Sequence, residues 1–170
     1  MQHIYSQLPG WFSWPRFYSR MVEKFNGGLL VEIGTYKGCS FSYLVVEAIN
    51  SKKNFDIVGI DACCWPDIEP DFNKNMNPLK GHFRTMFGGD SFDRAKEFED
   101  NSIDMLFIDG NHTYEFVKKD IESFLPKMKK GGVIAGHDYN DCHPGVIQAV
   151  NEAFKDVNYD KQEDVWSVQL

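Results

Sequence analysis

Residues 29–38 read LLVEIGTYKG, an apolar run that ends in a turn framed by two glycines. A short apolar run is typical of a strand that is buried on both faces of a parallel sheet, and we expect a helix from about residue 38. The spacing does not match G-x-G-x-x-G, because Tyr36 and Cys39 stand where glycines are required, and the G-K-[ST] ending of a phosphate loop is absent. The segment predicts a pocket for a nucleoside-like ligand without a pyrophosphate. A tight turn without a ligand is the alternative.

The rest of the chain alternates between apolar runs and segments with helical periodicity, which is typical of α/β proteins. We expect strands at 29–33, 55–60, 83–87, 103–108 and 133–135, and helices at 13–26, 38–50, 113–125 and 144–155, with a short helix after residue 90. Residues 157–170 are expected to close the sheet as an antiparallel hairpin. Together these segments predict a doubly wound, mostly parallel seven-stranded sheet with helices on both faces, in a single domain spanning residues 1–170.

Two segments lie outside this alternation. The N-terminal helical segment, residues 1–27, is rich in aromatic residues, and we expect it to cover the sheet; a lid or a dimer contact, and hence a homodimer, is the alternative. Residues 62–81 contain three prolines and are expected to form a lid-like loop with one helical turn around Phe72.

Composition restricts the classes of partner. The chain has 170 residues, a formal net charge of −7 and no basic cluster, which argues against nucleic acid. No apolar stretch approaches the length of a membrane span, and the N-terminus lacks the pattern of a signal peptide. The four cysteines form no zinc-type pair, and we expect reduced thiols in a cytoplasmic protein, with Cys39 buried.

Polar residues follow the predicted strands at the edge where parallel sheets bind ligands. Asp61 ends the second strand, where an acid can bind ribose hydroxyls; a loop or capping acid is the alternative. Asp90 follows the third strand and can accept the adenine amino group or cap a helix. Glu32 lies inside a buried strand and needs a partner, for which we expect a charged ligand group or a backbone amide.

A second group of polar residues follows the fourth and fifth strands. Asp109 and Asp138 are expected to converge there, and like charges this close need a cation or a raised pKa. Their oxygens suit Mg²⁺, or Mn²⁺ if an imidazole such as His137 joins them. His112 and His137 are each candidates for a catalytic base or a ligand, or else hydrogen-bonded loop residues. His143 precedes a proline at a helix start and is expected to be structural.

The motifs VEIGTYKGCS (31–40), GID (59–61), IDGNHTYE (108–115) and GGVIAGHDY (131–139) resemble those of class I S-adenosylmethionine-dependent methyltransferases. The chain is most similar to the small macrocin-type, sugar-modifying O-methyltransferases (methyltransferase domain 24), over residues 28–155. The resemblance implies that the methionine part of the cofactor is surrounded by Glu32, Gly34, Tyr36, Gly38 and Ser40. It also implies that Asp61 holds the ribose, that Asp90 and Ser91 border the adenine, and that Asp109 lies at both the cofactor and the metal.

The resemblance implies a methyltransferase that uses a divalent metal and methylates a hydroxyl of a small molecule such as a sugar or another small polyol. Two positions depart from the family pattern: Asn111 and Tyr139 stand where several relatives have an acid or an amide. These departures leave two alternatives open, a metal-independent N- or C-methyltransferase and a binding module that has lost catalysis. A dehydrogenase is disfavoured because the fingerprint glycines are missing.

Overall fold

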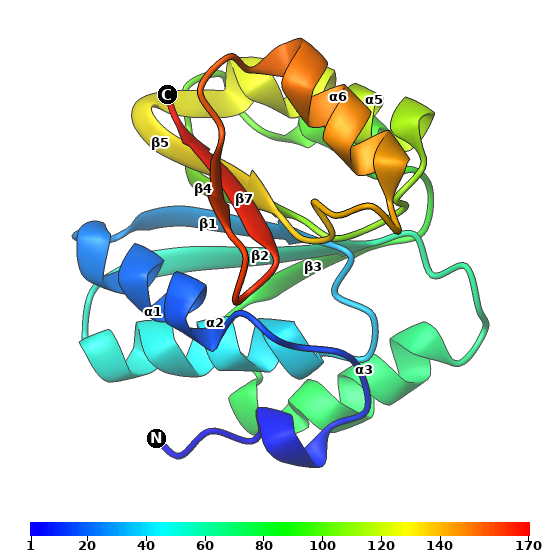
Figure 1. The fold of residues 1–170 in the computed structure, drawn as a ribbon. Coiled ribbons are helices and arrows are strands. Elements are labelled where there is room, and N and C mark those ends of the chain that lie inside the picture. The colour runs from blue at the N-terminus through cyan, green and yellow to red at the C-terminus, as the bar shows by residue number, and fades with distance from the viewer.

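The computed structural model describes residues 1–170 and contains one seven-stranded sheet (Figure 1). Its strands are β1 (Gly28–Ile33), β2 (Phe55–Asp61), β3 (Arg84–Phe87), β4 (Ile103–Ile108), β5 (Met128–Gly136), β6 (Asn158–Asp160) and β7 (Val165–Gln169). The strand order is β3-β2-β1-β4-β5-β7-β6, with β1 to β5 parallel and β7 antiparallel to both β5 and β6. The predicted fold class, including the closing hairpin, is confirmed.

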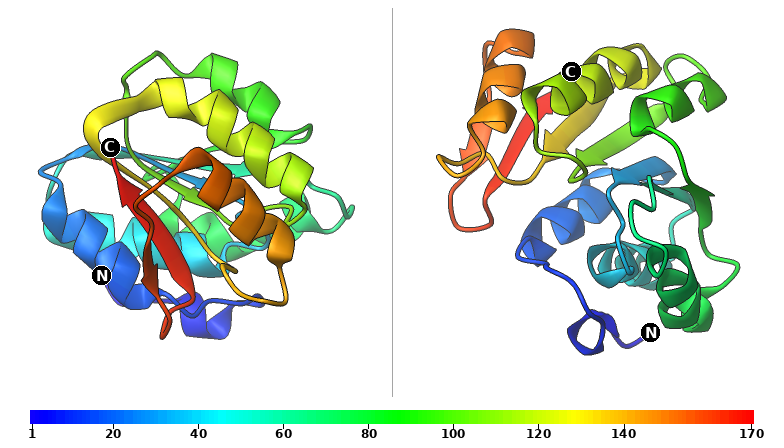
Figure 2. Two further views of the ribbon diagram at one scale, coloured as in Figure 1. Left: turned by 45° about the horizontal axis from the view of Figure 1, so that its top comes forward. Right: turned by 90° about the vertical axis from the view of Figure 1, so that its right-hand side faces the viewer.

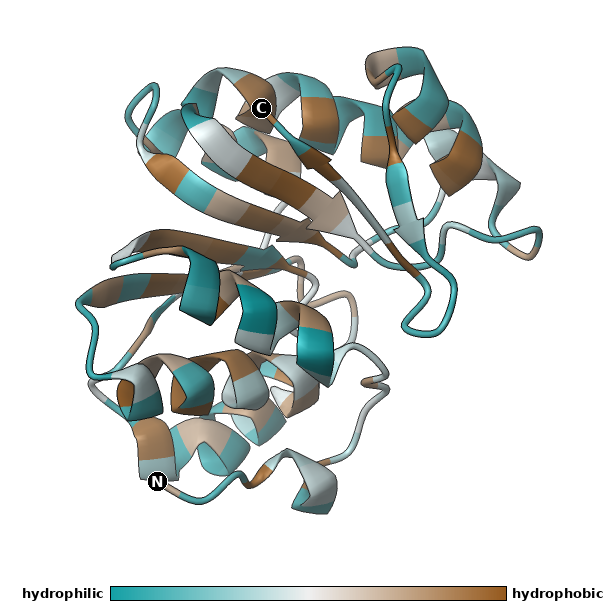
Figure 3. Ribbon diagram, turned by 60° about the vertical axis from the view of Figure 1, so that its left-hand side comes forward, coloured by the Kyte–Doolittle hydropathy of each residue, from teal (hydrophilic) through white to brown (hydrophobic).

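Helices cover both faces of this sheet (Figure 2). They are α1 (Pro15–Lys24), α2 (Cys39–Ser51), α3 (Ile68–Met76), α4 (Ser91–Arg94), α5 (Tyr114–Phe124) and α6 (Pro144–Ala153), with short 3₁₀ turns η1 (Tyr5–Gln7), η2 (Asn77–Leu79), η3 (Ala95–Glu97) and η4 (Leu125–Lys127). One apolar core joins α1, α2 and α3 to one face, and a second joins α5 and α6 to the other. Successive residues of each strand alternate between the cores, as Leu30 and Val31 do. The central strands are therefore apolar on both faces, and Figure 3 shows hydrophobic colour along most of their length.

The register brings the carboxyl ends of the central strands to one edge. Ile33 at the end of β1 pairs with Ile60 of β2 on one side and with Ile108 of β4 on the other. The chain runs outward from β1 through β2 to β3 and then returns to β4, so that β1 and β4 form the point where the strand order reverses. Open α/β sheets bind ligands at this point, because the loops that leave the two strands diverge there.

Residues 62–81 contain more helix than predicted, and the expected loop is correct only for residues 62–67 and 80–81. Phe72 and Met76 of α3 are buried in the core against α2, which anchors the segment. The prolines mislead because Pro70 lies in the first turn of α3 and Pro78 in the short turn η2, where a missing N–H costs little. β5 is also longer than predicted, because it continues through the glycines at 131 and 132.

The N-terminal segment covers the sheet as predicted. Trp14, Phe17 and Tyr18 are buried, and each ring lies within 5.4 Å of the Phe107 ring of β4. Trp11 is the exception, since 81% of its surface is exposed. None of the helices combines the length and the apolar character that a membrane crossing requires.

Candidate active site

Two clefts meet at the carboxyl ends of β1 and β4. The larger, of about 520 Å³, extends toward β2 and α4, and the smaller, of about 360 Å³, extends toward β5 and the N-terminal segment. Both are lined by Gly34, Tyr36, Asp109 and His112, so their shared wall consists of the loops that follow the two central strands. The two clefts therefore adjoin at these four residues.

The turn after β1 depends on Gly34 and Gly38. Gly34 has a φ of +91°, and an added Cβ would clash with the backbone carbonyl of Asp109, so glycine lets the turns after β1 and β4 approach closely. Gly38 has a φ of +93°, and its Cβ would lie 2.9 Å from Met76 of α3. Gly38 borders neither cleft and instead permits the start of α2 to pack against α3.

Asp61 ends β2 at the wall of the larger cleft, where the sequence places it. Its two carboxylate oxygens accept hydrogen bonds from the backbone N–H groups of Tyr36, at 2.7 Å, and Cys63, at 2.8 Å. Burial raises the pKa of this carboxyl, and the two amide hydrogen bonds act in the opposite direction. The carboxylate is thus held in one orientation and retains lone pairs that can accept hydroxyl groups.

Glu32 lies behind the clefts and is fully buried. Its carboxylate accepts hydrogen bonds from the hydroxyls of Tyr18, at 2.8 Å, and Ser40, so its partners within the protein are two hydroxyls and not the expected backbone amide. Burial raises the pKa of Glu32 to about 8, although both hydrogen bonds lower it. Of the residues predicted around the methionine part, Gly34, Tyr36 and Ser40 line a cleft, whereas Glu32 and Gly38 support that wall from behind.

Asp90 and Ser91 lie at the far end of the larger cleft. Asp90 is the residue before α4, but its side chain makes no capping hydrogen bond. The Ser91 hydroxyl donates to Asp120, a buried carboxyl of α5 that the sequence analysis did not identify. A signal was present, because Asp120 lies three residues after Val117 and four before Phe124, on the apolar face of the helix.

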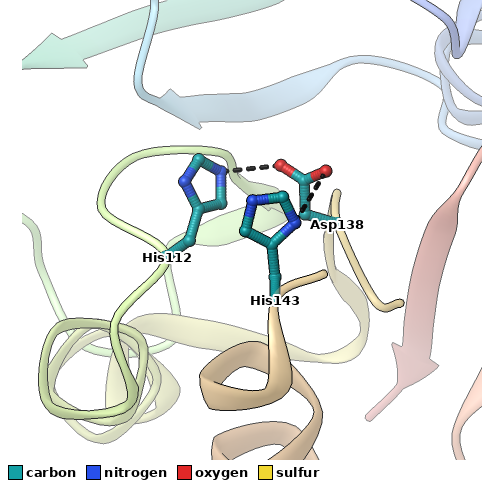
Figure 4. A group of neighbouring side chains, drawn as sticks. All are labelled: His112, Asp138 and His143. Atoms are coloured by element: carbon teal, nitrogen blue, oxygen red, sulfur yellow. Dashed lines mark ion pairs between the residues drawn. The ribbon is translucent and has the colours of Figure 1, made fainter. Parts of the chain in front are cut away.

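Carboxylates and imidazoles gather at the smaller cleft, around Asp138 (Figure 4). Asp138 follows β5 and lies between three imidazoles: His112 Nε2 is 2.8 Å from Oδ2, whereas the Nδ1 atoms of His137 and His143 are 3.2 and 3.3 Å from Oδ1. Asp109 joins from the end of β4, with Oδ1 at 3.5 Å from His112 Nε2 and 3.9 Å from His137 Nδ1. The register of β4 and β5 thus brings the predicted acids together.

The charges in this cluster shift one another's pKa. Hydrogen bonds to Asp109 and Asp138 raise the pKa of His112 to about 9. Burial raises the pKa of Asp138, but the hydrogen bonds from His112 and His137 outweigh it and hold this pKa far below its usual range. Burial also raises the pKa of Asp109, with the neighbouring histidines opposing it. Burial lowers the pKa of His137, but its contacts with both acids leave it raised. The cluster therefore favours positive charge beside its two carboxylates.

The contact with Ser13 bears on which ring nitrogen of neutral His137 carries the proton. Ser13 Oγ lies 3.3 Å from the carbonyl of Glu163 and 3.1 Å from His137 Nε2, and when its hydroxyl donates to the carbonyl, Nε2–H of His137 donates to Ser13. In the neutral ring the lone pair of Nδ1 then faces Asp138 and Asp109. That arrangement needs either a proton or a cation, and metal-binding histidines commonly have such an outer partner. Asp109, His137 and Asp138 place ligand atoms within 4.8 Å of one another.

Comparison with known proteins identifies the family to which the chain belongs. The model of a family described as Methyltransferase domain matches residues 31–139, from β1 to the residue after Asp138. The chain belongs to this family. The resemblance inferred from the motifs is thereby confirmed, and the matched residues include all that line the larger cleft and all but Gly10 and Trp11 of those that line the smaller one.

The chain also resembles two curated proteins of uncharacterised function. It is 34% identical over 139 residues to protein R132 of Acanthamoeba polyphaga mimivirus, and the aligned region covers 77% of this chain and 61% of that protein. It is 43% identical over 143 residues to protein y4gI of Sinorhizobium fredii, covering 80% of this chain and 16% of that protein. The chain therefore spans less than two thirds of the length of each relative.

Solved structures share the fold at low identity. An O-methyltransferase from Bacillus cereus in complex with SAH superposes with a TM-score of 0.69 at 17% identity, covering 97% of this chain and 86% of that one. CalS11, a TDP-rhamnose 3′-O-methyltransferase of calicheamicin biosynthesis, gives 0.68 at 15% identity, covering 91% and 76%. The structure class is that of Rossmann-like methyltransferases.

The two departures from the family pattern have local explanations. Asn111 accepts a hydrogen bond from the backbone N–H of Thr113 at 3.0 Å, which shapes the turn before α5. Tyr139 donates to Asn151 at 2.6 Å and its ring packs against Tyr159, so it packs and does not line either cleft. Neither residue joins the cluster around Asp138, whereas His143, which was expected to be only structural, does.

Proposed function

We infer that this methyltransferase domain transfers the methyl group of S-adenosylmethionine to a hydroxyl of a small molecule. The observation that carries the inference is the junction of the two clefts at Gly34, Tyr36, Asp109 and His112. One cleft offers fixed acceptors suited to a nucleoside, and the other offers acids and imidazoles suited to a reacting hydroxyl. Methyl transfer needs in-line approach of the two reactants, and positioning supplies most of its catalysis.

The larger cleft fits an adenosine group. Asp61 would accept hydrogen bonds from the two ribose hydroxyls, because it lines the cleft and its two backbone hydrogen bonds leave a lone pair free on each carboxylate oxygen. Asp90 and Ser91 would border the adenine. Gly34 and Tyr36 would contact the methionine part, where the left-handed glycine allows close approach of the backbone.

The smaller cleft fits the acceptor, and Asp109, Asp138 and His137 would hold a divalent ion such as Mg²⁺ or Mn²⁺ there. A bound ion would lower the pKa of the acceptor hydroxyl and orient it. His112 lines both clefts and is partly exposed, so its Nε2 can bind the ion. It can receive the hydroxyl proton at Nε2 only in its neutral form, because the raised pKa of about 9 keeps a proton on the ring at neutral pH. His137 is the other candidate for this role, although its Nε2 is already bonded to Ser13.

The acceptor is proposed to be a sugar or another small polyol. The support is the family membership together with the fold shared with CalS11, whose printed activity is TDP-rhamnose 3′-O-methylation. The rival proposal is a binding module that keeps the cofactor without catalysis. Asn111 favours it, because an amide at this position removes one possible metal ligand or base and serves the local turn instead.

Cofactor binding is tested by thermal shift with S-adenosylhomocysteine, which should raise the melting temperature in a concentration-dependent manner, whereas NAD should not. Asp61→Ala should remove most of the shift, and Asp56→Ala, an exposed acid near the start of the same strand, should not. An equal shift in Asp61→Ala would refute the cofactor assignment. Labelled S-adenosylmethionine with a panel of hydroxylated acceptors then separates the two proposals, since a binding module would leave every acceptor unlabelled.

A further inference from the structure

His143 lies at the point where the loop after β5 enters α6, and its backbone is fixed by the helix start. Its N–H donates to the carbonyl of Asn140 at 2.9 Å, its own carbonyl accepts from Val146 at 3.0 Å, and Pro144 occupies the first helical position. This role needs no imidazole, because the side chain makes no capping hydrogen bond. The ring instead points to Asp138 and lies beside the His112 ring, as Figure 4 shows.

The ring nitrogen that faces Asp138 is unsatisfied. His143 Nδ1 is buried and has no hydrogen-bond partner, although it lies 3.3 Å from Asp138 Oδ1. A buried polar atom without a partner is costly, and few occur in folded proteins. His112 approaches the other carboxylate oxygen at 2.8 Å, and the two imidazole rings lie 4.7 Å apart between centroids. One ligand atom from each of the three residues lies within 4.8 Å of the others.

We propose that His112, Asp138 and His143 bind a first-row transition-metal ion. Two imidazoles and one carboxylate suit Mn²⁺, Fe²⁺, Co²⁺, Ni²⁺ or Zn²⁺, whereas Mg²⁺ and Ca²⁺ prefer oxygen ligands throughout. Three protein ligands leave coordination positions open for water or a substrate oxygen. The purpose of the ion rests on the proposed methyl transfer, but its binding does not.

This ligand set competes with the group formed by Asp109, His137 and Asp138, because Asp138 belongs to both. The two sets differ in access. His137 has 8% of its side chain exposed and is fixed by Ser13, with the Trp14 ring 4.3 Å away, whereas 35% of the His143 side chain and 36% of that of His112 are exposed. Asp138 also adopts a φ of +59°, which is uncommon outside glycine and frequent at functional sites. His112 and His143 are thus the more exposed imidazoles beside Asp138, whereas His137, and not His143, lines the smaller cleft together with Asp138.

The test is a titration of chelator-treated protein with Co²⁺, followed by its visible absorption and by calorimetry, with Mg²⁺ titrated in parallel. We expect a single Co²⁺ to bind more tightly than Mg²⁺. His143→Gln should weaken Co²⁺ binding by at least about tenfold, since even outer-shell losses reach this size. His82→Gln is the matched control, because His82 is exposed before β3 at the opposite end of the sheet and should leave binding unchanged.

His137→Gln distinguishes the two ligand sets and should weaken Co²⁺ binding less than His143→Gln does. The proposal is overturned if His143→Gln binds Co²⁺ as the wild type does, if His137→Gln has the larger effect, or if Mg²⁺ binds as tightly as Co²⁺. S-adenosylhomocysteine thermal shifts on the same samples report folding and cofactor binding independently. Loss of that shift with retained Co²⁺ binding would overturn the proposed function and leave the metal site in place.

Discussion

Asp120 gives the protein a stability that falls as the pH rises. Its carboxyl is buried on the apolar face of α5, with 1% of the residue exposed, and its hydrogen-bond donor is the Ser91 hydroxyl. No ion pair reaches it. Burial raises its pKa from 3.8 to about 7, the hydrogen bond from Ser91 lowers it, and the nearby charge of Asp90 raises it further.

The sign follows from proton uptake. Between the unfolded pKa of 3.8 and the folded pKa of about 7, the folded protein holds a proton at Asp120 that the unfolded chain releases. The free energy of unfolding contributed by this group is therefore greatest below the unfolded pKa, declines by about 1.4 kcal/mol per pH unit, and is lost above the folded pKa. The whole decline is about 4 kcal/mol, of which about 3 kcal/mol falls between pH 5 and pH 8.

Asp120→Asn removes this titration and keeps the size of the side chain. The free energy of unfolding of the variant minus that of the wild type should be about 3 kcal/mol larger at pH 8 than at pH 5, as measured by urea denaturation at both values. Glu122→Gln, an exposed carboxyl on the same helix, should give a difference that does not change with pH. The same constant difference for Asp120→Asn would refute the reasoning, because it would show that Asp120 does not hold a proton in the folded protein.

Three further outcomes are expected. Gly34→Ala should lower the free energy of unfolding by at least about 2 kcal/mol, because its Cβ would meet the Asp109 carbonyl. Gly88 is also left-handed but lies in open space, so Gly88→Ala should cost only about 1 kcal/mol. Equal losses for the two variants in urea denaturation would refute the clash. Tyr18→Phe should cost about 1–3 kcal/mol in the same assay, since it removes one of two donors to the buried Glu32, and an unchanged midpoint would contradict that role. Chelation with EDTA should abolish methyl transfer and added Mn²⁺ should restore it, whereas activity that is indifferent to chelator would remove metal from the mechanism.

The strands could be predicted because both faces of the sheet are covered. Residues 29–33 and 103–108 are almost entirely apolar in sequence, and the structure places them as β1 and β4 at the centre. Their shared edge also made two positions predictable, the convergence of Asp109 with Asp138 and the placement of Asp61 in the same cleft as Asp109, since parallel strands bring their carboxyl ends together. The α3 segment was less predictable, because its prolines suggest a loop and only tertiary packing of Phe72 and Met76 shows otherwise.

The partners of the buried acids could not be derived from local sequence. Glu32 is satisfied by Tyr18, fourteen residues away, and by Ser40 across the turn, and neither spacing has a sequence pattern. His143 was assigned to a helix start, which is correct for its backbone, but the direction of its ring depends on how α6 docks beside Asp138. Sequence therefore places residues at an edge, whereas packing between distant elements decides which atoms face one another.

The N-terminal segment lies outside the family match, which begins at residue 31, but it supplies two contacts to the site. Ser13 fixes the ring of His137, and Tyr18 donates to Glu32 beneath the turn. A fragment trimmed to begin at residue 28 would leave a buried carboxylate short of a donor, free the imidazole to rotate, and uncover the Phe107 face of β4. Expression boundaries and chimaeras of this protein should accordingly be drawn ahead of Ser13.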